Sequence, residues 1–357
     1  AGERIASGET GESVAVFGGN GAEARPLGEL TSPTIKFTSP LKPNLFSFAT
    51  NELSQDSFLA WLLQWADSTC AEHDQALHEA AQDFVRRLLS LQGNSPEQIT
   101  KVEVERQWER IDVCADINEE HLLIIEDKTG TGQHSNQLAR YRNVAQAWCE
   151  KEGRRLTCVY LKTHSECDAR RTDAVAEGYA TVTRGDILEF LETHEIDTDI
   201  YRDLRDRLRE LESREAQFTE KRIGDWGWDD WTGFYRALEK ARSLSNWSTQ
   251  TRPGAGQFLN AVLNFPYCQV YPLYMQIEQG PLCFKIGDVE PEVDRGDIWR
   301  QYHQILMERV EGAPGLERPS RYRGGSYMTL ARVPSEVWLG SPESHLDLEA
   351  VVSKLNA

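Results

Sequence analysis

The sequence lacks the features that mark secreted, membrane and zinc-binding proteins. Its seven cysteines are an odd number and include no Cys-x-x-Cys pair, which argues against a disulfide framework or a zinc knuckle. No apolar run approaches the ~20 residues that span a bilayer. No apolar signal region opens the chain. These absences favour a cytoplasmic protein with reduced thiols and no membrane partner.

Positive charge is also in short supply. The 57 Asp and Glu residues outnumber the 39 Lys and Arg residues, and the formal net charge is −18. The whole molecule is therefore no polycation, and any nucleic-acid site requires a local basic groove. The length of 357 residues and the hydrophobic content of 39% allow two domains of ordinary size.

The composition divides the chain into four parts. Residues 1–44 are rich in Gly, Ser, Thr, Pro and Glu without sustained periodicity, which predicts a flexible arm. Its glycine cluster lacks the Lys-Ser/Thr and the helix of a phosphate loop. We expect a first domain over residues 45–196 and a charged connecting helix over 197–222. A C-terminal α+β domain over 223–357 would then serve substrate binding, dimerisation or sensing.

The most informative stretch is a predicted β-hairpin over residues 110–128, in which two apolar runs flank a polar turn. Regular pairing about that turn places Asp112 opposite Glu126, with Cβ atoms roughly 4.5–5.5 Å apart. Because side chains alternate along a strand, Lys128 shares the face of Glu126. Asp127 points away from that face, as a surface or opposite-face residue. Two acids and an ammonium group are thus expected at one place.

Two carboxylates this close repel each other unless a cation lies between them or one binds a proton. Mg²⁺ bonds carboxylate oxygens at about 2.0–2.1 Å, so the predicted spacing suits chelation. The alternative interpretation is a half-buried ion-pair cluster of Asp112, Glu126 and Lys128. The elements around the hairpin favour the metal site.

The flanking elements predict a mixed β-sheet sandwiched by helices, an α/β fold. A helix begins at residues 51–56 with Ser54 as its cap, and a second helix and a strand precede the hairpin. A helix from about Ser135, two further strands and another helix follow it. The C-terminal domain is expected to contain helices and the strand-like runs 258–263, 270–278, 282–286 and 327–333.

Four short motifs give the first domain a family resemblance. They are Asn51-Glu52-Leu53-Ser54-Gln55-Asp56, Arg110-Ile111-Asp112, Ile125-Glu126-Asp127-Lys128 and Gln137-Leu138-Ala139-Arg140-Tyr141. In this order they resemble the PD-(D/E)XK nuclease superfamily, in its branch of bacterial nuclease-like proteins. The resemblance covers about residues 51–191. Ile111 stands where the family name has Pro, a residue often missing in this superfamily.

The resemblance implies a restriction-endonuclease-like αβββαβ core that cleaves phosphodiester bonds with Mg²⁺, or with Mn²⁺ in its place. Asp112 and Glu126 would be metal ligands, and the backbone carbonyl of Asp127 would be a third. Glu52 matches an acid that adds a metal contact in this superfamily. An ordinary first-turn acid that favours the helix dipole is the alternative for Glu52.

The resemblance also implies roles for two further side chains. Lys128 would orient or help to deprotonate the attacking water and offset the charge of the transition state. Gln137 matches the polar residue that follows the active site, with a helix-capping or lining role as its alternative.

These residues predict a Mg²⁺-dependent deoxyribonuclease with DNA as its substrate. The resemblance suggests a setting in bacterial anti-phage defence or restriction, with a homodimer and a defence-system partner protein as candidate assemblies. The alternative is a non-catalytic nuclease-fold protein that binds nucleic acid or a protein partner. RNA is the alternative substrate.

Overall fold

The computed structural model describes residues 42–128, 136–241, 244, 246–252, 256–268, 270–310, 315–319 and 324–356. From Pro43 onward the chain forms one compact unit. The predicted arm over residues 1–44 lies outside the described residues, except for its last three positions.

A five-stranded mixed sheet in the order β1-β2-β3-β4-β5 forms the centre of the first domain. Strands β1, β2 and β3 pair antiparallel, whereas β3, β4 and β5 are parallel. The predicted mixed sheet is confirmed. The strands are β1 (Val102–Trp108), β2 (Ile111–Ile117), β3 (His121–Lys128), β4 (Arg155–Lys162) and β5 (Ala180–Thr183).

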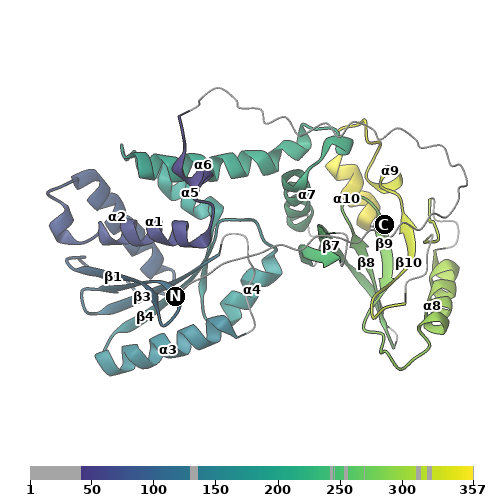
Figure 1. Cartoon of the computed structure of the whole chain (residues 1–357), viewed down its shortest axis with the longest axis horizontal. Coiled ribbons are helices and arrows are strands. Elements are labelled where there is room, and N and C mark those ends of the chain that lie inside the picture. Colours follow the sequence, from purple (N-terminus) through teal and green to yellow (C-terminus); the bar gives the residue numbers. More distant parts are fainter. Residues whose placement is uncertain are drawn as a thin grey trace, which may run out of the picture. The chain divides into compact units, whose positions relative to one another are not determined.

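Helices cover both faces of this sheet because its central strands are apolar on both sides (Figure 1). One buried core lies between the sheet and helices α1, α2, α5 and α6, and a second lies beneath α3 and α4. These helices are α1 (Glu52–Gln64), α2 (Gln75–Ser90), α3 (Gln137–Glu152), α4 (Asp168–Ala176), α5 (Arg184–Thr193) and α6 (Asp199–Ala216). The αβββαβ order is therefore present. Helix α4 was not predicted, because charged residues interrupt its short apolar pattern.

The second sheet is antiparallel throughout, in the order β10-β9-β8-β7-β6. Its strands are β6 (Asn246–Arg252), β7 (Gly256–Cys268), β8 (Pro272–Ile277), β9 (Leu282–Ile286) and β10 (Met328–Val333). Buried aromatic residues join one face to α7 (Trp228–Lys240), α9 (Ser335–Trp338) and α10 (Leu348–Asn356). Helix α8 (Arg295–Arg309) packs on the other face. Strand β6 was not predicted, because its sequence is largely polar.

Helix α1 begins one turn earlier than its predicted cap. The Asn51 side chain, not that of Ser54, is the N-cap and accepts a hydrogen bond from the Ser54 backbone N–H at 2.9 Å. As a result, Glu52 is the first helical residue, and its side chain projects from the end of α1 that adjoins the hairpin strands.

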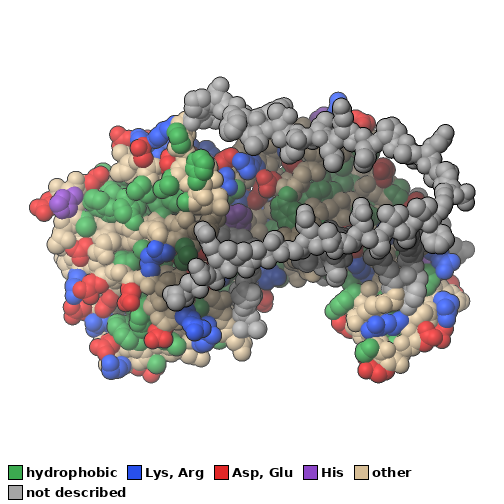
Figure 2. All heavy atoms as spheres, in the orientation of Figure 1, with side chains coloured by type: hydrophobic (Ala, Val, Ile, Leu, Met, Phe, Trp, Pro, Cys, Tyr) green, Lys and Arg blue, Asp and Glu red, His purple; other side chains and the backbone are tan. Residues whose placement is uncertain are grey.

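The remaining composition-based expectations concern thiols, membranes and charge. None of the six cysteines whose side chains are described is in a disulfide bond. Within the described ranges, none of the helices is both long enough and apolar enough to cross a bilayer. Acidic and basic side chains are interspersed over the face of the molecule shown in Figure 2.

Candidate active site

The hairpin has the predicted register. Val113 pairs with Ile125 and Ile117 pairs with His121, so the residue before Val113 lies opposite the residue after Ile125. Asp112 and Glu126 therefore face each other across β2 and β3. Positive φ angles at Glu109 and Arg110 form the tight turn that reverses the chain just before Asp112.

Lys128 lies among three carboxylates. Its Nζ is 2.7 Å from Glu126 Oε1, 3.5 Å from Asp112 Oδ2 and 3.7 Å from Glu52 Oε2. The side chains of Lys128 and Glu126 are almost completely buried, whereas Glu52 retains 28% exposure. The structure thus brings together four of the residues that the sequence selected, from three different elements.

Three hydrogen bonds hold the site from its edges. Gln137, the first residue of α3, donates from Nε2 to Glu126 Oε1 at 2.6 Å. The backbone N–H of Asp127 donates to Asp112 Oδ2 at 2.9 Å. The Lys128 ammonium donates to the backbone carbonyl of Asp127, also at 2.9 Å. Gln137 is thus oriented toward the acids and does not merely cap its helix.

Burial and like charge govern the titration of the acids. Burial, together with the charge of Asp112, raises the pKa of Glu126 to about 8, although Lys128 opposes this shift. Burial would lower the pKa of Lys128, but Glu126, Asp112 and Glu52 outweigh it and raise that pKa. Lys128 is therefore held as an ammonium group.

Asp127 faces the opposite side of β3 and is completely buried, so of the two predicted alternatives it is the opposite-face residue and not a surface residue. Gln55 Nε2 on α1 donates to Asp127 Oδ1 at 2.5 Å. Nearby Asp56 is also fully buried. Burial and the neighbouring carboxylates raise the pKa of Asp127 and bring that of Asp56 to about 7. Asp127 Oδ2 and both Asp56 oxygens have no hydrogen-bond donor among the described residues, and a proton on one acid would satisfy the pair.

The oxygen donors at the hairpin fit a hard divalent cation. Glu126 Oε2 is buried without a hydrogen-bond partner among the described residues, so one donor oxygen is uncommitted. Within the described ranges, no group of three or more His, Cys, Asp or Glu side chains could hold a metal ion. The candidate donors are two carboxylates and one backbone carbonyl, which suits Mg²⁺, a cation that keeps several waters in its shell.

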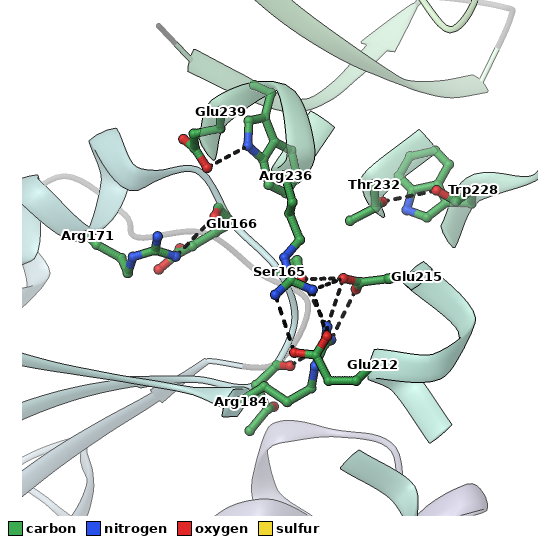
Figure 3. A network of polar contacts seen from close by, with 12 residues as sticks. Ser165, Glu166, Arg171, Arg184, Glu212, Glu215, Trp228, Thr232, Arg236 and Glu239 are labelled. Carbon is green, nitrogen blue, oxygen red and sulfur yellow. Dashed lines mark hydrogen bonds and ion pairs between the residues drawn. The ribbon is translucent and has the colours of Figure 1, made fainter. Parts of the chain in front are cut away.

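A second polar network, absent from the sequence prediction, joins α5, α6 and α7 (Figure 3). Arg184 binds Glu215 through both Nη atoms, at 3.1 and 2.8 Å. Arg236 Nη1 binds the same Glu215 at 2.6 Å and Glu212 at 2.9 Å. Arg184, Glu212 and Arg236 line a cavity of about 200 Å³. Because the paired residues lie on three different helices and are 21 to 31 positions apart, no local motif could reveal them.

Comparison with known families gives a match to one segment of the chain. The family model described as the PD-(D/E)XK nuclease superfamily matches residues 43–222, which is just over half of the chain. Comparisons with curated proteins and with solved structures gave no match. The matched segment contains the whole mixed sheet, helices α1 to α6 and the hairpin with its acids.

Proposed function

Because this chain belongs to the PD-(D/E)XK nuclease superfamily, we propose that it is a metal-dependent nuclease that hydrolyses phosphodiester bonds in DNA. One observation carries the proposal: Glu126, Asp112 and Glu52 converge on the buried ammonium of Lys128. Such a cluster is costly to bury for stability alone, because each charge loses its hydration.

The proposed cation ligands are the carboxylates of Asp112 and Glu126 and the backbone carbonyl of Asp127. Glu52 would add a contact only after its side chain moves, because no three acidic side chains of the described residues are already placed as ligands. A bound Mg²⁺ or Mn²⁺ would supply Lewis-acid activation of water and neutralise phosphate charge. The two facing carboxylates repel each other, and a cation would relieve that repulsion. Gln137 would keep the Glu126 carboxylate in place through its hydrogen bond.

Lys128 would act on the phosphate. In hydrolysis, a water oxygen bonds to phosphorus, one ester P–O bond breaks, and the departing oxygen takes up a proton. Negative charge builds up on the phosphoryl oxygens as this occurs. An ammonium group already held in a buried position stabilises that charge without reorganising at the moment of reaction.

The substrate and setting are further parts of the proposal. DNA is proposed as the substrate on the family resemblance, and it is compatible with a metal-assisted route, which needs no 2′-hydroxyl group. Free thiols fit a cytoplasmic location. A role in bacterial defence, with a homodimer or a partner protein, rests on the family resemblance alone. Residues 223–357 would serve substrate binding, dimerisation or sensing.

The test is cleavage of linear, circular and single-stranded DNA with Mg²⁺, with Mn²⁺ and with EDTA. Wild type is compared with Lys128→Met, and Lys101→Met is the control because Lys101 pairs with Glu119 on an exposed surface. We expect metal-dependent cleavage that is lost only in Lys128→Met. Circular dichroism verifies that each variant is folded.

Other outcomes distinguish the alternatives. Equal cleavage by wild type and Lys128→Met would contradict the proposed site. Cleavage of RNA but not of its 2′-deoxy counterpart would favour the RNA alternative. Nucleic-acid binding without cleavage or metal binding would support the non-catalytic nuclease-fold protein.

A further inference from the structure

The side chain of Asp127, the middle residue of the Glu126-Asp127-Lys128 triplet, is energetically unfavourable to bury. Asp127 is fully buried on the face of β3 opposite Glu126, where an apolar residue would avoid desolvation. The Gln55 amide, itself 7% exposed, donates to Asp127 Oδ1 at 2.5 Å. A buried acid that loses such a donor is left with an unsatisfied oxygen, which is unfavourable. The hydrogen bond between Gln55 and Asp127 therefore favours one alignment of α1 against β3.

The backbone of Asp127 forms part of the candidate site. Its N–H holds Asp112 Oδ2, and its carbonyl, a proposed cation ligand, accepts a hydrogen bond from Lys128. Rotation of the Asp127 backbone would turn both groups away from their partners. Because Gln55 holds the Asp127 side chain on the opposite face of β3, the peptide groups on both sides of Asp127 are restrained.

Thr163 fixes the orientation of the Gln55 amide. Its hydroxyl donates to Gln55 Oε1 at 2.7 Å, which directs the amide NH₂ toward Asp127. The Thr163 backbone N–H also donates to the Lys128 carbonyl oxygen at 3.3 Å. One amide therefore connects α1, the end of β3 and the residue that follows β4.

Gln55 also connects Asp127 to Glu52. The two residues lie three positions apart on α1, so they occupy neighbouring places on one helix face. The hydrogen bond between Gln55 and Asp127 therefore fixes the position of α1 along β3, and with it the position of Glu52 relative to Lys128.

We infer that Gln55 is a positioning residue that holds the Asp127 backbone and Glu52 in place for cation binding. The inference rests on the proposed function, because it assigns Gln55 a role toward the cation of that same site. It predicts that losing the amide weakens cation binding, while the cation-bound site remains competent.

The test replaces Gln55 with methionine, which has similar length but neither donor nor acceptor. Gln64→Met is the matched control, because Gln64 lies on the same helix and donates to the Val102 carbonyl at 2.8 Å, away from the site. Three readouts are used: Mn²⁺ affinity by calorimetry, hydrogen exchange of the Asp127 amide by NMR in metal-free buffer, and the rate of DNA cleavage at saturating Mn²⁺.

We expect Gln55→Met to weaken Mn²⁺ binding by about 10-fold, as changes behind metal ligands commonly do. The Asp127 amide should exchange faster, and saturating Mn²⁺ should restore the wild-type cleavage rate. Gln64→Met should leave all three quantities unchanged. Wild-type affinity and exchange in Gln55→Met would overturn the inference, as would equal changes in Gln64→Met.

A substitute variant and a readout that needs no metal keep the test decisive. If Gln55→Met does not fold, Thr163→Val takes its place, and it should produce smaller changes in the same direction; no change would overturn the inference. If wild type neither binds Mn²⁺ nor cleaves DNA, the proposed function fails. Slow exchange of the Asp127 amide in wild type and fast exchange in Gln55→Met would still support the positioning role.

Discussion

Glu126 and Lys128 are in contact at 2.7 Å inside the protein, while Asp112 faces Glu126 from the neighbouring strand. We expect this cluster of Asp112, Glu126 and Lys128 to lower the stability of the fold and to support its function. Burial and carboxylate repulsion make the cluster costly. In the proposed function the same features favour an additional cation, so substitutions here should separate stability from activity.

The Glu126→Gln variant tests this separation. Glutamine preserves the size of the side chain and can accept from Lys128, but it cannot ionise to the carboxylate that a cation requires. We expect DNA cleavage to fall by on the order of 100-fold or more. The unfolding temperature without metal should stay the same or rise, and the increase on adding Mg²⁺ should disappear. A marked loss of metal-free stability with cleavage retained would contradict this prediction.

Glu52 should contribute less than Glu126. Its carboxylate is 28% exposed and lies 3.7 Å from Lys128, which is longer than the Glu126 contact. We expect Glu52→Gln to slow cleavage by about 10-fold or less, because an exposed charge is partly screened by water. Steady-state cleavage rates over a range of Mg²⁺ concentrations measure this. A loss as large as that of Glu126→Gln would make Glu52 an essential ligand.

At the scale of elements, the hairpin and the α5–α6–α7 network differ in how far the sequence reveals them. The facing of Asp112 and Glu126 depends on local pairing about one turn, so alternation of side chains predicted it correctly. The contact between Gln55 and Asp127 depends on how α1 docks onto β3, and no local pattern encodes that docking. For the same reason, the arginine–glutamate network escaped prediction.

The network also predicts how stability depends on pH. Burial would raise the pKa of Glu212, but hydrogen bonds from Arg236 and Arg184 outweigh it and lower the pKa to about 2. The stabilisation is therefore complete above the ordinary pKa near 4.5 and is lost as the pH falls toward 2. Glu212→Gln should lower the unfolding temperature at pH 7 and lose that deficit on acidification.

Thermal unfolding of wild type and Glu212→Gln across this pH range provides the measurement. Glu97→Gln, which changes an exposed acid in the segment before β1, is the control and should track wild type at every pH. A deficit in Glu212→Gln that stays constant down to pH 2 would show that the carboxylate charge does not stabilise the network.

At the scale of the whole molecule, the net charge of −18 opposes the approach of DNA. The proposed function therefore requires local cationic contacts with phosphate. Each contact contributes about −0.9 to the slope of log affinity against log salt concentration on duplex DNA. We expect a clearly negative slope for DNA binding with Ca²⁺ in place of Mg²⁺. Binding that is indifferent to salt would contradict a phosphate-contacting groove.

Much of the architecture could be predicted from the sequence. The first sheet, most of its helices and most strands of the second sheet follow from apolar periodicity, which signals an element without knowledge of its neighbours. Charged α4 and polar β6 escaped prediction, because their contacts with the rest of the fold stabilise them rather than their own patterns. The helix cap at Asn51 was misplaced at Ser54, since both residues are good caps.

Anomalous diffraction from crystals of the protein grown with Mn²⁺ tests most directly the proposal that the hairpin holds a divalent cation. We predict an anomalous peak between Asp112 and Glu126, at bonding distance from both carboxylates and from the Asp127 carbonyl oxygen. The same peak should be absent from crystals of Glu126→Gln. Mn²⁺-dependent DNA cleavage by a protein whose crystals show no peak at the hairpin would contradict the claim.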